Sequence, residues 1–229
     1  MRNHQLTRPH TTVILAMSAD GKIANTQRQA ARFGSAQDRA HLEAEVAKVD
    51  GVLFGAGTLR AYGTTMRVMN PQLIQQREAG GKPPQPVQIV VSRQAKIDRN
   101  LRFFQQPVPR WLLTTSAGAN RWQNSSHFES IRVDETATGE IDWPQALAQM
   151  PFERLAVLGG GELVASLFAE DLIDELRLTV CPLVLGGRDA PSPVSGVGLP
   201  AGKGLELISV EAIAQEVFLH YRVIGTLQD

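Results

Sequence analysis

Short apolar runs recur along the chain, and each has the length of a single buried strand. Continuous runs of this kind are typical of a parallel sheet that is covered on both faces. They predict strands over residues 12–17, 51–54 and 155–158, and segments 87–91, 110–115, 131–133 and 176–180, which mix apolar with polar residues, are read as further strands. Near the C-terminus the pattern changes, because segments 205–213 and 216–224 alternate apolar and polar side chains. These two segments predict an antiparallel pair.

Helical patterns lie between several of these strands. Ser35 is a suitable N-cap for the first helix, and apolar residues at 163, 164, 167 and 168 share one face of the last. We expect helices over 36–48 and 143–150, and a further helix from Glu162 onward. A short helix that follows the glycine turn at 55–58 is expected to extend through Ala61. Region 65–86 shows little periodicity, and 182–204 is a long loop rich in glycine and proline. Strands that alternate with helices predict an α/β fold with a mostly parallel central sheet and an antiparallel C-terminal strand pair.

The composition limits the domain count, the partners and the location. The 229 residues are enough for one sizeable domain, and we expect a polar, loosely ordered arm over 1–10 followed by a single domain over 11–229. The 23 basic and 23 acidic residues give a net charge of zero, so nothing favours nucleic acid or an anionic membrane as a partner. No apolar run approaches the length of a membrane span, and we expect a cytoplasmic protein.

Two glycine turns each follow a predicted buried strand and precede a predicted helix. They are residues 159–161 (GGG) and 55–58 (GAGT). A helix that begins directly after such a turn offers free N–H groups to a phosphate, although a glycine turn can also serve packing alone. Neither turn completes the dinucleotide fingerprint GxGxxG, because Arg60 and Val164 stand where the third glycine would be. In a parallel sheet both turns would lie at the carboxyl edge, where ligands bind.

Other kinds of catalytic chemistry find little support in the sequence. The five histidines are scattered without metal-ligand spacing, and there is no GxSxG, GxxxxGK[ST] or HExxH motif. Cys181 is the only cysteine, which excludes an internal disulfide and a cysteine zinc site. We therefore expect no metal, and a fold that holds an organic cofactor carrying the reactivity.

Four segments together resemble a known family. They are MSADGKIA (17–24), DGVLFGAGTLRAYG (50–63), VVSR (90–93) and VLGGGELVASLFAEDLIDELRLTVCPLVLGG (157–187). Their order is that of the riboflavin-biosynthesis reductase family, which comprises the C-terminal domain of the bifunctional pyrimidine deaminase/reductase and its stand-alone relatives. The resemblance covers about residues 12–223 and implies a dihydrofolate-reductase-like three-layer sandwich. It also implies a homodimer that uses NADPH to reduce a ribosylamino-pyrimidine phosphate, with hydride reaching the sugar C1′ presented as an imine.

The matched positions carry implied roles. Contacts to NADPH are implied at Ala16, Ser35, Thr58, Ser92, Arg93, Gly159, Gly160, Gly161, Glu162 and Leu163. Within this set, Ser92 and Arg93 would hold the adenosine 2′-phosphate, and the Gly159–Gly160 peptide would be cis. Catalytic roles are implied for Asp20 and Lys22, and substrate contacts for Phe33, Tyr62, Arg67 and Leu158.

Some of these residues also have a purely structural interpretation. Asp20 precedes Gly21 and could simply form a turn, and Glu162 could be a carboxylate favoured by the helix dipole. Arg93 could be a solvated arginine at a strand end. These alternatives stay open at the level of sequence.

The chain also departs from the bacterial members of this family, and each departure falls on the substrate side. Leu158 replaces a glutamate before the paired glycines, and Tyr62 replaces an aspartate four residues beyond the threonine. Bacterial members carry a DDPxLxxR run, of which only Arg67 is left here. The arginine that they commonly carry late in the first helix is also missing from this chain. Because such polar groups decide substrate discrimination, other substrates stay open. The alternatives are another small heterocycle or imine, a dihydrofolate-reductase-like activity, and a non-catalytic nucleotide-binding dimer.

Overall fold

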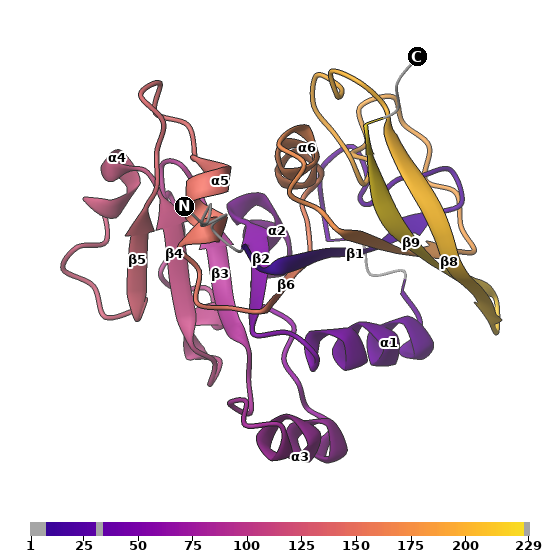
Figure 1. Ribbon diagram of the computed structural model, residues 1–229, viewed down its shortest axis with the longest axis horizontal. Helices are drawn as coiled ribbons and strands as arrows, with labels where there is room; N and C mark the ends of the chain where they lie inside the picture. The colour runs from indigo at the N-terminus through magenta and orange to yellow at the C-terminus, as the bar shows by residue number, and fades with distance from the viewer. Residues whose placement is uncertain (1–7, 31–33, 227–229) are drawn as a thin grey trace, which may run out of the picture.

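The protein is organised around one mixed β-sheet (Figure 1). A computed structural model describes residues 8–30 and 34–226. Within these residues the strands are β1 (His10–Ser18), β2 (Gly51–Gly55), β3 (Val87–Val91), β4 (Arg110–Thr114), β5 (Ser130–Val133), β6 (Arg154–Val157), β7 (Glu175–Cys181), β8 (Lys203–Ile213) and β9 (Glu216–Thr226). The sheet order is β5-β4-β3-β2-β6-β1-β7-β9-β8. Strands β1 to β7 pair in parallel, whereas β9 is antiparallel to both β7 and β8. Every predicted strand is therefore present.

Helices cover both faces of the sheet. They are α1 (Ala36–Val46), α2 (Ala56–Tyr62), α3 (Pro71–Ala79), α4 (Ser116–Ala119), α5 (Trp143–Ala148) and α6 (Gly161–Ala169), with a 3-10 helix over Arg102–Gln105. The sequence did not predict α3, which lies in the region without clear periodicity. This helix begins with the N-cap Asn70 followed by Pro71, and it inserts the buried Arg77 where an apolar residue would be expected. None of the described helices is long and apolar enough to cross a membrane.

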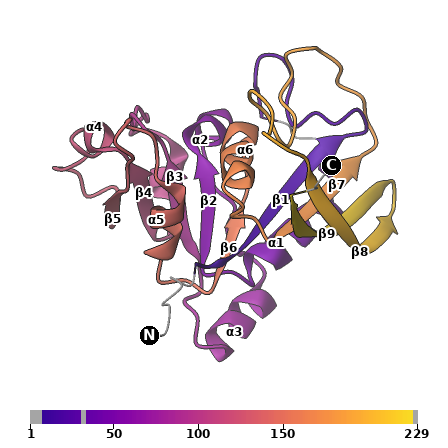
Figure 2. The same ribbon diagram turned by 45° about the horizontal axis from the view of Figure 1, so that its top comes forward.

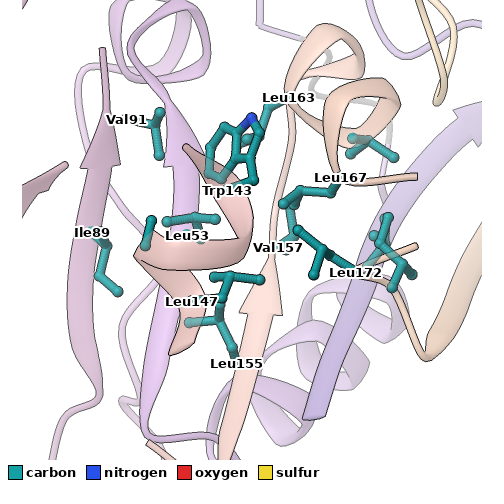
Figure 3. Packing of buried hydrophobic residues seen from close by; sticks show 14 of the residues in the cluster. Leu53, Ile89, Val91, Trp143, Leu147, Leu155, Val157, Leu163, Leu167 and Leu172 are labelled. Carbon is teal, nitrogen blue, oxygen red and sulfur yellow. The ribbon is translucent and has the colours of Figure 1, made fainter. Parts of the chain in front are cut away.

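Alternate residues of the parallel strands face two separate apolar clusters. Figure 3 shows the first, in which Trp143 and Leu147 of α5 and Leu167 of α6 pack against sheet residues such as Leu53 and Val157. The second cluster contains side chains of α1 and α2 packed on the opposite set of strand positions, including the neighbours Val52 and Ala156. The arrangement is a helix–sheet–helix sandwich, and the burial on both faces explains why central segments such as 51–54 and 155–157 are apolar throughout.

The chain is tied into the sheet from Arg8 onward. The Arg8 guanidinium donates from Nη1 to Oδ2 of Asp174 at 2.7 Å and from Nη2 to Oδ1 at 2.9 Å. The Thr11 N–H also donates to Oδ2 of Asp174, at 2.7 Å. These contacts fix the start of β1, which begins at His10, two residues earlier than the sequence predicted.

Candidate active site

A cleft with a volume of about 1250 Å³ follows the carboxyl ends of the central parallel strands. Its wall includes Ala16 of β1, Gly55 at the end of β2, Ser92 after β3 and Gly159 after β6. Asp38, in the first turn of α1, also lines it. This is the edge of a parallel sheet at which α/β proteins bind ligands.

The two glycine turns predicted from the sequence lie side by side at this edge. Strands β2 and β6 are neighbours in the sheet, so the helices that follow them, α2 and α6, begin next to each other (Figure 2). The Gly55 N–H donates to the Gly159 carbonyl oxygen at 2.9 Å and joins the turns directly. The Gly159–Gly160 peptide is cis, as the resemblance implies. Thr58, in the first turn of α2, also lines the cleft.

The space between the turns suits a phosphate-bearing cofactor. Gly160 caps α6, and no side chain of the described residues hydrogen-bonds the start of this helix. A Cβ at Gly159 would lie 3.5 Å from Thr58 Oγ1 and 3.4 Å from Leu15 Cδ2, and a Cβ at Gly160 would also lie 3.5 Å from Thr58 Oγ1. Glycine therefore leaves room for a ligand to approach the helix N-terminus, which favours anions.

Gly161 has a different reason to be glycine. A Cβ there would lie 2.3 Å from the Ser192 carbonyl oxygen and 2.5 Å from Ser195 Oγ. The close approach is to the loop 182–202, which packs against the start of α6 through a hydrogen bond from the Ser195 N–H to the Gly161 carbonyl oxygen. This glycine serves packing within the chain, although it also lines the cleft.

Ser92 and Arg93 lie at one end of the cleft, where β3 stops. The Ser92 hydroxyl accepts a hydrogen bond from the Ala95 N–H at 3.0 Å and so fixes the turn. The Arg93 guanidinium is 60% exposed and forms an ion pair with Glu140, which also lines the cleft. The sequence pattern did not single out Glu140, because it lies in the irregular segment before α5.

Asp20 holds two loops together. Its carboxylate accepts hydrogen bonds from the Ser18 hydroxyl at 2.6 Å and from the N–H groups of Leu185 and Gly186 at 3.0 and 2.7 Å. These bonds, the one from Ser18 first, lower the pKa of Asp20 to about 2. Neither Asp20 nor Lys22 is among the described residues that line the cleft. These hydrogen bonds agree with the structural interpretation of Asp20 as a turn residue. The catalytic roles of Asp20 and Lys22 stay predictions.

Ser35 caps α1 as the sequence predicts. Its hydroxyl accepts hydrogen bonds from the N–H groups of Gln37 and Asp38 at 3.0 and 3.1 Å and donates to Glu216 at 2.5 Å. Ser35 itself does not line the cleft within the described chain, but its neighbours Gly34 and Asp38 do. Its contact with the cofactor therefore stays a prediction.

The remaining predicted positions divide between the cleft and its surroundings. Ala16, Tyr62, Leu158, Glu162 and Leu163 line the cleft. Glu162 pairs with Arg28 at 3.2 Å, which joins the start of α6 to the loop after β1.

Two predicted substrate contacts do not line the cleft in the described part of the chain. Arg67 is half-buried and is not among the lining residues. Phe33 lies outside the described residues. Asp38 and Arg39, by contrast, line the cleft from α1 and were not predicted. Asp38 follows the N-cap by three residues, a spacing that a capping role would explain, so no sequence signal assigns it to a ligand.

The fold is a dihydrofolate-reductase-like α/β sandwich, which confirms the predicted fold class. The family model of the RibD C-terminal domain matches residues 9–219, and the chain belongs to this family. The resemblance identified from the four sequence segments is thereby confirmed.

Relatives and solved structures agree with this assignment. The chain is 30% identical over 195 residues to the 2,5-diamino-6-ribosylamino-4(3H)-pyrimidinone 5′-phosphate reductase of Archaeoglobus fulgidus, covering 82% of this chain and 87% of that protein. A pyrimidine reductase-like protein from Corynebacterium diphtheriae shares the fold with a TM-score of 0.79 at 19% identity, covering 94% and 92% of the two chains. The deaminase/5-amino-6-(5-phosphoribosylamino)uracil reductase of Thermotoga maritima gives 0.70 at 17% identity, over 94% and 57%.

Proposed function

We propose that this protein is an NADPH-dependent reductase that converts the ribose of a ribosylamino-pyrimidine 5′-phosphate to a ribityl chain. The observation that carries the proposal is the joining of two glycine turns, each at a helix start, inside one cleft of a RibD C-terminal domain. The relative from Archaeoglobus fulgidus is named for a reductase reaction of this class. The cofactor, when bound, supplies the hydride that reduces C1′ of the substrate.

The chain's own groups would bind and orient the cofactor. The backbone from Gly159 to Leu163 would face the diphosphate, because the start of α6 offers N–H groups without a side-chain cap. Arg93 would meet the 2′-phosphate at the end of β3, where a guanidinium can form two parallel hydrogen bonds. Ala16 and Thr58 also line the cleft, and the nicotinamide would lie near them.

The substrate would occupy the part of the cleft between the glycine turns and α1. Leu158 and Tyr62 line this part in place of the acidic residues of bacterial relatives, and Arg39 contributes a positive charge from α1. Apolar and aromatic side chains beside the glycine turn would exclude water from C1′. Exclusion of water protects an imine from hydrolysis before it is reduced.

We also propose that the protein is a homodimer formed through its C-terminal strands. Strand β8 is the last strand of the sheet and carries exposed apolar side chains at Leu205, Leu207, Ile208, Val210 and Ile213. A long edge strand with such side chains is normally covered by another chain. A second copy is the partner that the family resemblance implies. The cytoplasmic location expected from the sequence stays a prediction.

Turnover tests the proposed reaction directly. The purified protein is mixed with NADPH and a ribosylamino-pyrimidine 5′-phosphate, the loss of reduced nicotinamide absorbance is followed, and the ribityl product is identified by mass. Binding of NADPH by calorimetry, measured separately, shows whether the cofactor site is functional. NADPH binding without reduction of such a substrate would contradict the proposed reaction while retaining the cofactor.

A further inference from the structure

The end of the cleft next to Arg93 has an apolar floor. Four side chains form this floor, and each is about nine-tenths buried: Val91 at the end of β3, Ile141 and Trp143 around the start of α5, and Leu163 in the first turn of α6. Figure 3 shows Trp143 between Val91 and Leu163, near the carboxyl ends of the strands. The floor can therefore take an apolar face of a ligand out of water.

Trp143 is the residue of this floor whose side chain carries a polar atom, the indole Nε1. Its N–H donates to no group within residues 8–30 and 34–226, whereas the indole N–H of Trp122 donates to the Ala95 carbonyl oxygen at 2.8 Å. Nor is Nε1 of Trp143 among the described atoms that are both enclosed and unpartnered, which belong to His10, Arg77, Arg132 and Arg177. Figure 3 shows this nitrogen on the side of the ring toward the carboxyl ends of the strands. The N–H therefore opens onto the cleft, where a ligand can accept its hydrogen bond.

Packing holds the indole ring and leaves only its edge for a ligand. Trp143 is 9% exposed, so its ring has too little free surface to stack against another ring. The chain before it is held as well, because the Asp142 N–H donates to the Asp134 carbonyl oxygen at 3.0 Å. The Asp142 carboxylate in turn accepts a hydrogen bond from the Gln145 N–H at 3.0 Å. Trp143 therefore acts through its N–H, and a donor held in this way loses little freedom when it binds.

A tight hairpin over residues 135–141 forms a polar rim beside this floor. An antiparallel bridge joins its two ends, and the Thr136 N–H donates to the Glu140 carbonyl oxygen at 2.8 Å. The N–H and the hydroxyl of Ser116 donate to the Glu135 carboxylate at 2.9 and 2.5 Å, which ties the hairpin to α4. Thr136, Thr138 and Glu140 line the cleft. The floor, the indole N–H and this rim together form a slot whose parts are fixed by hydrogen bonds and packing.

The covalent structure of the cofactor identifies the group that fits the slot. Glu140 belongs to the rim and also pairs with Arg93, so the slot adjoins the end of the cleft proposed for the 2′-phosphate. In NADPH the adenine is attached to C1′ of the same ribose whose C2′ carries that phosphate, so the base must lie beside it. Adenine has apolar faces, and its ring nitrogens N1, N3 and N7 accept hydrogen bonds. The base therefore matches both the apolar floor and the indole N–H.

We propose that Trp143 recognises the adenine of the cofactor by donating its indole N–H to a ring nitrogen of the base. Arg93 would meet the phosphate that NADPH alone carries, whereas Trp143 would hold the base that NADPH and NADH share. This inference rests on the proposed function. It adds a cofactor contact that neither the glycine turns nor the family resemblance assigns.

The first test compares NADPH with NADH in wild type and Trp143→Phe. The substitution removes the N–H and keeps an aromatic ring, and a neutral hydrogen bond corresponds to about 2- to 12-fold in affinity. We expect Trp143→Phe to bind both cofactors about 2- to 12-fold more weakly, by the same factor for each. Calorimetric titration measures this at a temperature at which thermal unfolding shows the variant to be fully folded. Trp111→Phe is the matched control, because Trp111 packs against Phe152 and is not among the described residues that line the cleft, so both affinities should stay unchanged.

The second test alters the base and can be made on the wild type alone. Adenosine 2′,5′-bisphosphate is compared with its 1-deaza, 3-deaza and 7-deaza analogues, each of which replaces a ring nitrogen by C–H. We expect one analogue to bind the wild type about 2- to 12-fold more weakly than the parent compound, which identifies the accepting nitrogen. The same difference should vanish in Trp143→Phe, because a contact between two groups is lost when either group is removed.

The possible failures are distinguishable. Wild-type affinity for both cofactors in Trp143→Phe, or a loss confined to NADPH, would overturn the contact with the base and leave the proposed reductase intact. Equal binding of the parent compound and all its deaza analogues to the wild type would overturn it too. A wild type that binds neither NADPH nor NADH would overturn the proposed function, and this inference with it. Binding of both cofactors through Trp143 without reduction of a ribosylamino-pyrimidine would support this inference and contradict only the proposed reaction.

Discussion

Arg93 and Glu140 form an ion pair across the end of the cleft where β3 stops. Both side chains are more than half exposed, so the pair itself contributes little to stability. Its importance lies in its position, because a cofactor with a 2′-phosphate would exchange the Glu140 carboxylate for a phosphate on the same guanidinium. In the proposed complex, Arg93 would attract the 2′-phosphate of NADPH and Glu140 would compete with that phosphate for the guanidinium.

Arg93→Ala should weaken NADPH binding and leave NADH binding nearly unchanged. The 2′-phosphate is present only in NADPH, and charge-assisted hydrogen bonds from Arg93 to it would be worth about 1.5–3 kcal/mol, or about 10- to 150-fold in affinity. Calorimetric titration of the variant with each cofactor measures the difference. Equal losses for the two cofactors, or no loss for either, would place the 2′-phosphate elsewhere.

Glu140→Gln should have the opposite effect on the same equilibrium. The substitution removes a negative charge that competes for Arg93 and repels the 2′-phosphate. Because exposed ion pairs are worth about 0–1 kcal/mol, we expect NADPH to bind up to about fivefold more tightly. The gain should shrink as the ionic strength rises, since exposed charges are screened by salt. Weaker NADPH binding in this variant would show that Glu140 contacts the cofactor favourably.

Gly160→Val and Gly161→Ala should separate ligand binding from folding. A valine at Gly160 would place methyl groups in the space beside Thr58, so NADPH binding should be lost while the unfolding midpoint changes little. A methyl at Gly161 would collide with the Ser192 carbonyl oxygen, and overpacking of this kind costs about 1–3 kcal/mol. Thermal unfolding and NADPH titration of both variants give the comparison. Wild-type NADPH affinity in Gly160→Val would make this turn purely structural.

Asp174→Asn should destabilise the protein at neutral pH but not in acid. Burial tends to raise the pKa of Asp174, but the hydrogen bonds from Arg8 and Thr11 outweigh it and hold the pKa below its usual range. A carboxyl with a depressed pKa in the folded state contributes stability above its unfolded pKa of about 3.9, and this is lost as the pH falls through the folded pKa. We expect a loss of about 1–2 kcal/mol at pH 7, measured by denaturant unfolding. The difference between the two proteins should shrink below about pH 3.

Val210→Lys should dissociate the proposed dimer. Val210 is 58% exposed on β8 in the single chain, and a lysine there would bury an unpaired charge in an apolar interface. A stable obligate interface buries about 2,000 Å² or more. Light scattering at micromolar concentration should therefore give a dimer for the wild type and a monomer for the variant. A monomeric wild type would contradict the proposal.

The strands were predictable because their burial leaves a direct trace in the sequence. Val52 and Ala156, for example, lie in runs that are apolar throughout, since both faces of their strands are covered. Helix α3 left no such trace. Arg77 occupies its buried side and donates hydrogen bonds to the carbonyl oxygens of Ala47, Val49 and Pro83, so a polar residue takes the place of the expected apolar one.

The site was predictable where backbone conformation dictates the residue type. Glycine turns after buried strands indicate a binding edge, and the structure brings the two turns together. The arrangement around Asp38 could not be predicted in this way, because it depends on a contact between segments that are far apart in the sequence. Nothing near Asp38 in the sequence shows that Glu216, on a strand of the C-terminal pair, takes over the cap of α1. Such a relationship becomes visible only when α1 and β9 are placed in space.

The hydrogen bond from the Gly55 N–H to the Gly159 carbonyl oxygen has a consequence for how the protein tolerates variation. The two turns come from segments about a hundred residues apart, yet each holds the backbone of the other in position. A change in either should therefore be felt by both, so the effects of paired substitutions will not add, as is general for residues in direct contact. Variants that alter the cofactor specificity of this enzyme will have to treat the two turns as one element.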